Sequence, residues 1–185
     1  PRLLDSELLL GGQLRRDEIG SVGLYDTVLR QRTDTVREDR IRQTATALYT
    51  ALKTPWLPWL RTTLGLRHDR IRAEVTPLAG AFNLGNGGKV SGSQTSPKLG
   101  LVLGPFGAQG NTEYYANWGR GFHSNDARGA TARTDPKNGN PMAAVPLLVR
   151  TQGSEVGLRT TVMPGWQSSL SLWRMNLDSE LVFIG

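Results

Sequence analysis

The stretch WLRTTLGLRHDRI (59–71) decides the fold class, because two kinds of side chain alternate along it. The even-numbered positions are apolar or nearly so: Leu60, Thr62, Leu64 and Leu66. The odd-numbered positions carry the charges: Arg61, Thr63, Gly65, Arg67 and Asp69. We call each set a parity of the strand. Alternation with a period of 2 predicts a β-strand with two unlike faces. The apolar parity turns polar only at His68, Arg70 and Arg72.

Two environments fit this strand. In a membrane β-barrel, Leu60, Leu64 and Leu66 would face lipid, and Arg61, Arg67 and Asp69 would face a polar lumen. An arginine on the lipid face costs about 2–4 kcal/mol at mid-depth and about 0–1 kcal/mol near the interface, which explains why the charges of that parity begin late. In a soluble β-sandwich, the same leucines would be buried between two sheets.

The composition narrows the choice of function. The 185 residues carry a net charge of +6, which is compatible with an anionic partner, but the arginines are spread along the chain rather than gathered in one tract. Cysteine is absent and only two histidines occur, His68 and His123, so no metal site and no nucleophile–base pair is indicated. We therefore expect neither an enzyme nor a cofactor. No run of about 18 apolar residues occurs, so no transmembrane helix is expected.

Strand-like segments recur along the whole chain. They cover 6–16, 40–53, 59–71, 93–104, 112–119, 149–162 and 166–177, and most approach or exceed the ~9–11 residues of a tilted membrane strand. Short Pro- and Gly-rich turns (54–58, 105–111, 163–165) alternate with long polar segments (17–39, 74–90, 120–147). Outer-membrane barrels show this alternation of short periplasmic turns and long external loops. All five tryptophans fall near expected strand ends, as in an aromatic girdle.

One segment has a second interpretation. Along 40–53, Ile41, Ala45, Leu48 and Leu52 are spaced like the apolar stripe of a helix. A basic amphipathic helix there would favour a nucleic-acid-binding domain, whereas the β-branched Thr44, Thr46 and Thr50 favour a strand.

One long loop offers candidate ligand contacts. His123 lies there between Arg120 and Arg128, and these three side chains could contact an anionic ligand.

Three segments together resemble the TonB-dependent outer-membrane receptors. They are WLRTTLGLRHDRI (59–71), YYANWGRGFHSNDARG (114–129) with its Gly-Arg-Gly-Phe element, and GSEVGLRTTVMPGWQSSLSLWRMNLDSELVFIG (153–185), which is similar to a closing barrel hairpin. The resemblance covers most of 40–185 and is weakest over 1–39.

The resemblance implies a fold, a location and a function. The expected fold is all-β: an antiparallel up-and-down meander over 1–185, forming part of a transmembrane barrel of about 22 strands. The family resides in the bacterial outer membrane and imports scarce nutrients such as ferric siderophores or cobalamin. Its partners are membrane lipid, a plug domain of the same protein, the TonB complex and a small-molecule substrate, with no nucleic acid. No plug and no TonB-binding motif is recognisable here, so we expect a barrel segment of a longer protein. The alternative is a soluble, secreted β-sandwich that binds a ligand.

Overall fold

The computed structural model describes residues 5–107, 111–163 and 165–179. The end of the closing-hairpin segment (180–185) and parts of two expected turns (108–110 and 164) lie outside the described residues. The described chain forms one antiparallel sheet of seven strands, and neighbours in sequence are neighbours in the sheet. The strands are β1 (Glu7–Val28), β2 (Gln31–Leu57), β3 (Leu60–Ala79), β4 (Gly88–Phe106), β5 (Thr112–Ser124), β6 (Leu148–Met163) and β7 (Trp166–Leu177).

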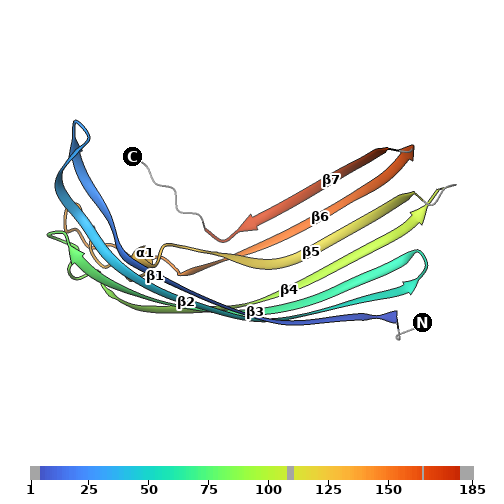
Figure 1. Ribbon diagram of the computed structural model, residues 1–185, viewed down its shortest axis with the longest axis horizontal. Helices are drawn as coiled ribbons and strands as arrows, with labels where there is room; N and C mark the ends of the chain where they lie inside the picture. The colour runs from blue at the N-terminus through green and yellow to red at the C-terminus, as the bar shows by residue number, and fades with distance from the viewer. Residues whose placement is uncertain (1–4, 108–110, 164, 180–185) are drawn as a thin grey trace.

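The sheet curves into a half-barrel, seen as an open trough in Figure 1. The hairpin turns β2–β3, β4–β5 and β6–β7 lie at one end, and the β1–β2 hairpin and the loops 80–87 and 125–147 lie at the other. We call these the short-turn end and the long-loop end. The predicted all-β meander is therefore confirmed.

Two rival interpretations of the sequence are wrong. Segment 40–53 is a strand throughout, because it lies inside β2 and pairs in register with both β1 and β3. The β-sandwich is wrong because the strands form one curved sheet rather than two packed sheets. Leu64 and Leu66 are consequently about half exposed (52% and 49%) instead of buried in a core.

The prediction that residues 17–39 form a long loop is also wrong. β1 and β2 continue through it as a paired ribbon and turn at Leu29 and Arg30, whose φ angles of 49° and 67° suit a two-residue hairpin. Three irregularities in the β1–β2 register lie in this ribbon and increase its twist. The other two long segments are loops only in part, because β3 extends to Ala79 and β5 extends to Ser124.

A small core lies on the concave side at the long-loop end. The helix α1 (Ala127–Thr131) packs there through Ala127 against Ile41, Ala73 and Val75, and a second cluster joins Ile71, Ala130 and Leu147. Within the described ranges, no helix is long and apolar enough to cross a membrane. Because Ile71, Ala73 and Val75 share the parity of Arg67 and Asp69, that parity of β3 is the concave one.

Candidate functional site

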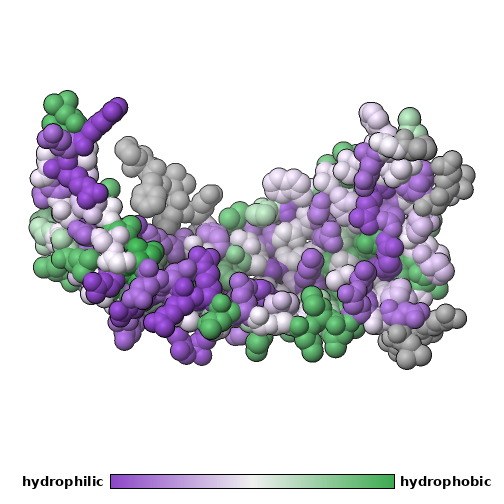
Figure 2. All heavy atoms as spheres, in the orientation of Figure 1, coloured by the Kyte–Doolittle hydropathy of each residue, from purple (hydrophilic) through white to green (hydrophobic). Residues whose placement is uncertain are grey.

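The convex face carries a broad apolar band. Strand register places Leu64 between Leu52 of β2 and Leu99 of β4, and it places Leu60 beside Leu103. The same face continues through Ala116, Val156 and Leu172 to the far strands. In Figure 2 apolar side chains gather along the lower, convex edge, away from the long-loop end. Leu60, Leu64 and Leu66 therefore belong to one continuous apolar surface, in which Leu60 is half-buried.

Aromatic side chains border this band at the short-turn end. The Trp59 and Phe106 rings lie 6.5 Å apart, Phe106 and Tyr114 lie 6.3 Å apart, and Trp56 Nε1 donates to Thr62 Oγ1 at 2.8 Å. Trp166 lies at the same end of the sheet, where β7 begins. The expectation that all five tryptophans lie near strand ends in an aromatic girdle is wrong for Trp173, which lies inside β7, pairs with Glu155 and so is on the concave face.

Arg67 and Asp69 form an ion pair on the concave face. Arg67 donates to the Asp69 carboxylate from Nε at 2.9 Å and from Nη2 at 2.8 Å, and it donates to Gln13 Oε1 at 3.0 Å. The guanidinium carbon also lies 5.7 Å from the centre of the Tyr49 ring. These contacts fix the Arg67 fork in one orientation, because a bidentate pair restricts both side chains.

A second concave cluster surrounds Glu113 of β5. Arg61 and Arg159 both bind its carboxylate, the latter from Nε at 2.6 Å. Farther along, Tyr115 and Asn117 donate to Glu155 at 3.4 Å each. The polar side chains of the concave face are thus oriented by ion pairs and hydrogen bonds to one another.

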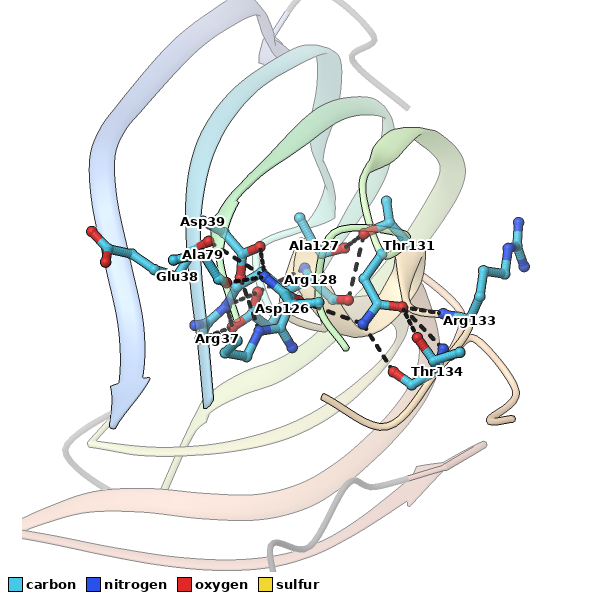
Figure 3. A network of polar contacts seen from close by, with 12 residues as sticks. Arg37, Glu38, Asp39, Ala79, Asp126, Ala127, Arg128, Thr131, Arg133 and Thr134 are labelled. Carbon is cyan, nitrogen blue, oxygen red and sulfur yellow. Dashed lines mark hydrogen bonds and ion pairs between the residues drawn. The ribbon is translucent and has the colours of Figure 1, made fainter. Parts of the chain in front are cut away.

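A buried amide network ties the loops to the wall at the long-loop end, as Figure 3 shows. Asn83 donates from Nδ2 to Asp39 Oδ1 (2.8 Å) and to Ala79 O (3.1 Å), and both side chains are fully buried. Asn86, equally buried, accepts at Oδ1 from the backbone N–H groups of Arg133 (2.8 Å) and Thr134 (3.0 Å). The network therefore connects β2, loop 80–87 and loop 125–147.

The structure separates the three loop residues that the sequence singled out. Arg120 lies on β5 with its guanidinium carbon 5.6 Å from the centre of the Trp118 ring, a residue of the convex parity. His123 has the opposite parity and pairs with Val149. Arg128 lies in α1, where it binds Asp126 from Nε at 2.9 Å. Arg120, His123 and Arg128 therefore do not form one cluster.

The contacts between Asp126 and Arg128 favour the charged form of both side chains, as the directions of their pKa shifts show. Burial acts to raise the pKa of Asp126, but the hydrogen bonds and charge of Arg128 outweigh it, so the pKa lies below its ordinary value. The same pair raises the pKa of Arg128, mainly through the Asp126 hydrogen bond. Asp126 also caps α1 by accepting from the Arg128 backbone N–H at 2.9 Å.

A polar cavity of about 710 Å³ lies where β5 separates from β4. The β4–β5 register ends at Lys98 and Gly119 toward the long loops, whereas the β5–β6 register continues to Ser124. The cavity is lined by His68, Ser93, Gln94, Thr95, Arg120, Arg150, Thr151, Gln152, Asn176 and Asp178. Arg120 therefore lines a cavity whose other lining side chains carry hydroxyl, amide and charged groups. Among the described residues no group of three or more acidic or histidine side chains could hold a metal ion.

Comparison with known families identifies this half-barrel. A family model described as TonB dependent receptor-like, beta-barrel matches residues 3–185. The chain belongs to this family of receptor barrels. The membership places the receptor barrel segment in the bacterial outer membrane, as the sequence predicted.

A solved structure supports the fold. The alcaligin outer membrane receptor FauA from Bordetella pertussis matches with a TM-score of 0.55 and 16% sequence identity over 96% of this chain. The receptor segment spans about a third (32%) of that structure. A search of curated proteins found no match.

Sequence reasoning missed the buried network of the receptor segment. Asp39, Asn83 and Asn86 lie in polar stretches that were expected to be exposed loops, and their contacts join residues more than 40 positions apart. The signal that could have found them is weak: asparagine sits among glycines in FNLGNGG (82–88). A buried asparagine that satisfies several backbone groups leaves no periodic pattern.

Proposed function

We propose that this segment forms part of the wall of an outer-membrane receptor that imports a scarce nutrient, such as a ferric siderophore or cobalamin, with energy from the TonB complex. The observation that carries the proposal is the division of one curved sheet into an apolar convex face and an ion-paired concave face, in a chain whose whole length matches the receptor barrels. In the proposed receptor, Leu60, Leu64 and Leu66 contact lipid. Arg61, Arg67 and Asp69 line the lumen and contact a polar plug domain.

The proposed plug contact follows from the charges on the concave face. Arg67 still has donors that can reach a partner, and the concave ion pairs present both signs of charge. Such a wall suits a polar plug better than an apolar one, because removing these charges from water against apolar groups would be costly.

The substrate contacts are proposed at the long-loop end. Arg120 reaches the polar cavity beside β4, and His123 lies on the other face of the same strand. Arg128, held by Asp126, would act by shaping loop 125–147 or by offering its remaining donors to an anionic ligand. This role of Arg120, His123 and Arg128 stays a prediction.

The test is uptake by the full-length receptor in a strain that has no other importer for the nutrient. Ferric siderophores and cobalamin, each radiolabelled, are supplied with and without a functional TonB complex. Uptake that disappears without TonB supports the function, and equal uptake in both strains contradicts it.

The contact residues are tested separately by affinity. Arg120→Ala, His123→Ala and Arg128→Ala, combined, should weaken ligand binding about 10-fold or more if the three residues contact an anionic ligand. Arg133→Ala, which removes an exposed cation of the same loop, serves as the matched control. Unchanged affinity in the triple variant would remove these residues from the site but leave the uptake function standing.

A further inference from the structure

The outer ends of β5 and β6 turn away from the edge of β4 and fold over its concave face. The β4–β5 pairing ends at Gly119, whereas β5 and β6 stay paired as far as Ser124 and Leu148. A Cβ atom placed on Gly92 of β4 would lie 2.9 Å from the Leu148 Cγ atom. Gly92 pairs with Ile71 and so has the concave parity of the sheet. The outer ends of β5 and β6 therefore lie on the lumen side of β4.

Apolar contacts hold both ends of the loop that connects β5 and β6. We call this loop, together with the strand ends that carry it (residues 120–150), the docked loop. Ala127 packs against β2 and β3 in one buried cluster. Ala130 and Leu147 belong to a second buried cluster on β3, which Phe122 extends. Because these side chains lie toward both ends of the loop, lifting either end would expose apolar surface that is now buried.

Buried amides hold the middle of the docked loop. The Asn86 side chain accepts from the N–H groups of Arg133 and Thr134, and its Nδ2 donates to the Thr134 carbonyl at 2.9 Å. Asn83 is bound in turn to Asp39 of β2 at 2.8 Å. A small displacement of the loop would leave these groups buried without partners, which is costly. The loop therefore has two stable arrangements, fully docked or fully released.

The outer part of the β1–β2 ribbon is held much less firmly. β2 pairs with β3 only as far as Glu38, so residues 25–35 of the ribbon pair only with one another in the part of the chain that the structure describes. Leu29 at the tip is 93% exposed. In Figure 1 the tip of this ribbon rises clear of the other strands. Segments with few buried contacts open at low free energy, so the ribbon serves as a mobile reference for the docked loop.

We propose that the docked loop is a fixed part of the lumen wall, which stays in place while a nutrient binds and is imported. The apolar clusters and the buried amides hold it at its ends and in its middle, so its release would break all of these contacts together. The mouth of the receptor is then permanently narrowed beside β4, and any closure over the nutrient must come from other segments. The proposal rests on the proposed function, because it concerns the import cycle.

A disulfide tests whether the docked position is compatible with import. A Cβ atom at position 92 would lie 3.7 Å from the Leu148 Cβ atom, which suits a disulfide in the double variant Gly92→Cys, Leu148→Cys. TonB-dependent uptake of radiolabelled ferric siderophores and cobalamin is measured in cells that carry the full-length variant, before and after oxidation. We expect the disulfide to form in the resting receptor and the uptake rate to stay unchanged.

Two results of the disulfide experiment would overturn the proposal. One is a loss of uptake on oxidation that dithiothreitol reverses, because the loop would then have to leave β4 during import. The other is failure of the two cysteines to react, because they would then not be close in the resting receptor. Gly92→Cys and Leu148→Cys as single variants, treated with the same oxidant, control for effects of the substitutions and of the oxidant itself.

Distances between spin labels test the docked loop without a disulfide and without transport. Labels at Asn138→Cys of the loop and Ser93→Cys of β4 should give one narrow distance distribution in the full-length receptor, with ferric siderophore, with cobalamin and with neither. Labels at Leu29→Cys and Ser93→Cys should give a broader distribution, because the ribbon lacks the docking contacts.

The outcomes separate the docked loop from the proposed function. A second population of distances between positions 138 and 93 when either nutrient is added would overturn the docked loop, even if uptake is normal. Absence of TonB-dependent uptake by the wild-type receptor, with the narrow distribution intact, would count against the proposed function and not against the docked position.

Discussion

Leu64 and its neighbour Thr63 lie on opposite faces of the sheet, so they test the two environments residue by residue. Leu64 lies on the convex face in the middle of the apolar band, whereas Thr63 beside it lies on the concave face. We expect Leu64→Arg to destabilise the full-length receptor in lipid bilayers by about 2–4 kcal/mol, and Thr63→Arg by less than about 1 kcal/mol. Reversible denaturant unfolding in vesicles measures both. Equal effects of the two substitutions would mean that the convex leucines do not contact acyl chains.

Gly157 is required by close packing on the concave face. A Cβ atom there would lie 2.5 Å from the carbonyl oxygen of Leu170 and 2.5 Å from the Tyr115 hydroxyl, and the backbone carbonyl cannot move easily. Gly157→Ala should therefore cost about 1–3 kcal/mol of unfolding free energy. Gly153→Ala is the control in the same strand, because its nearest neighbour would be 3.9 Å away. If Gly153→Ala is as harmful as Gly157→Ala, strand flexibility rather than packing explains the loss.

At the scale of single elements, the connection between loop 125–147 and the wall depends on Asn86. Asn86→Ala leaves the N–H groups of Arg133 and Thr134 without their acceptor, which should cost about 1–3 kcal/mol locally. The loop should then be cleaved faster by a protease added outside cells. Asn138→Ala, at an exposed turn of the same loop, should have little effect. Unchanged cleavage of Asn86→Ala would show that the core contacts of Ala130 and Leu147 hold the loop without the network.

The helix α1 should respond to acid through Asp126. Its pKa in the folded protein is lowered below the ordinary value of about 3.9, so the folded form binds a proton less readily than the unfolded form. The stabilisation is therefore complete above about pH 4 and is lost as the pH falls through the folded pKa. Hydrogen exchange over 125–131, corrected for intrinsic rates, should accelerate below about pH 4. In Asp126→Asn this acceleration should be absent, and its persistence would assign the acid response to another group.

The elements that the sequence predicted well are those whose two faces meet different surroundings. Over 59–71 one face is apolar and the other charged, so the period of 2 is visible and the predicted strand lies in β3. Over 17–39 apolar and polar side chains occur on both faces of the ribbon and the register shifts three times, so no regular alternation marks the strands there. The candidate loop residues fail to cluster for a related reason. Arg120 and His123 are three positions apart, and an odd spacing on a strand puts them on opposite faces.

At the scale of the whole molecule, the two edges of the sheet determine how the segment behaves. Among the described residues, β1 and β7 each pair with one strand, so each presents a row of backbone groups without a partner in the sheet. In hydrocarbon an unsatisfied group costs on the order of several kcal/mol, so a stable membrane form must pair both edges.

A polypeptide of these 185 residues should therefore self-associate when it is produced alone. In neutral detergent we expect oligomers by sedimentation velocity, with amide exchange slow in β3 and fast in β1 and β7, because the inner strands are paired on both sides. The full-length receptor under the same conditions is the control, and its amides in β1 and β7 should be as protected as those in β3. A monomeric 185-residue chain with slow amide exchange in all seven strands would contradict this expectation. In such a chain β1 and β7 would have to pair with each other, and they are not neighbours in the sheet.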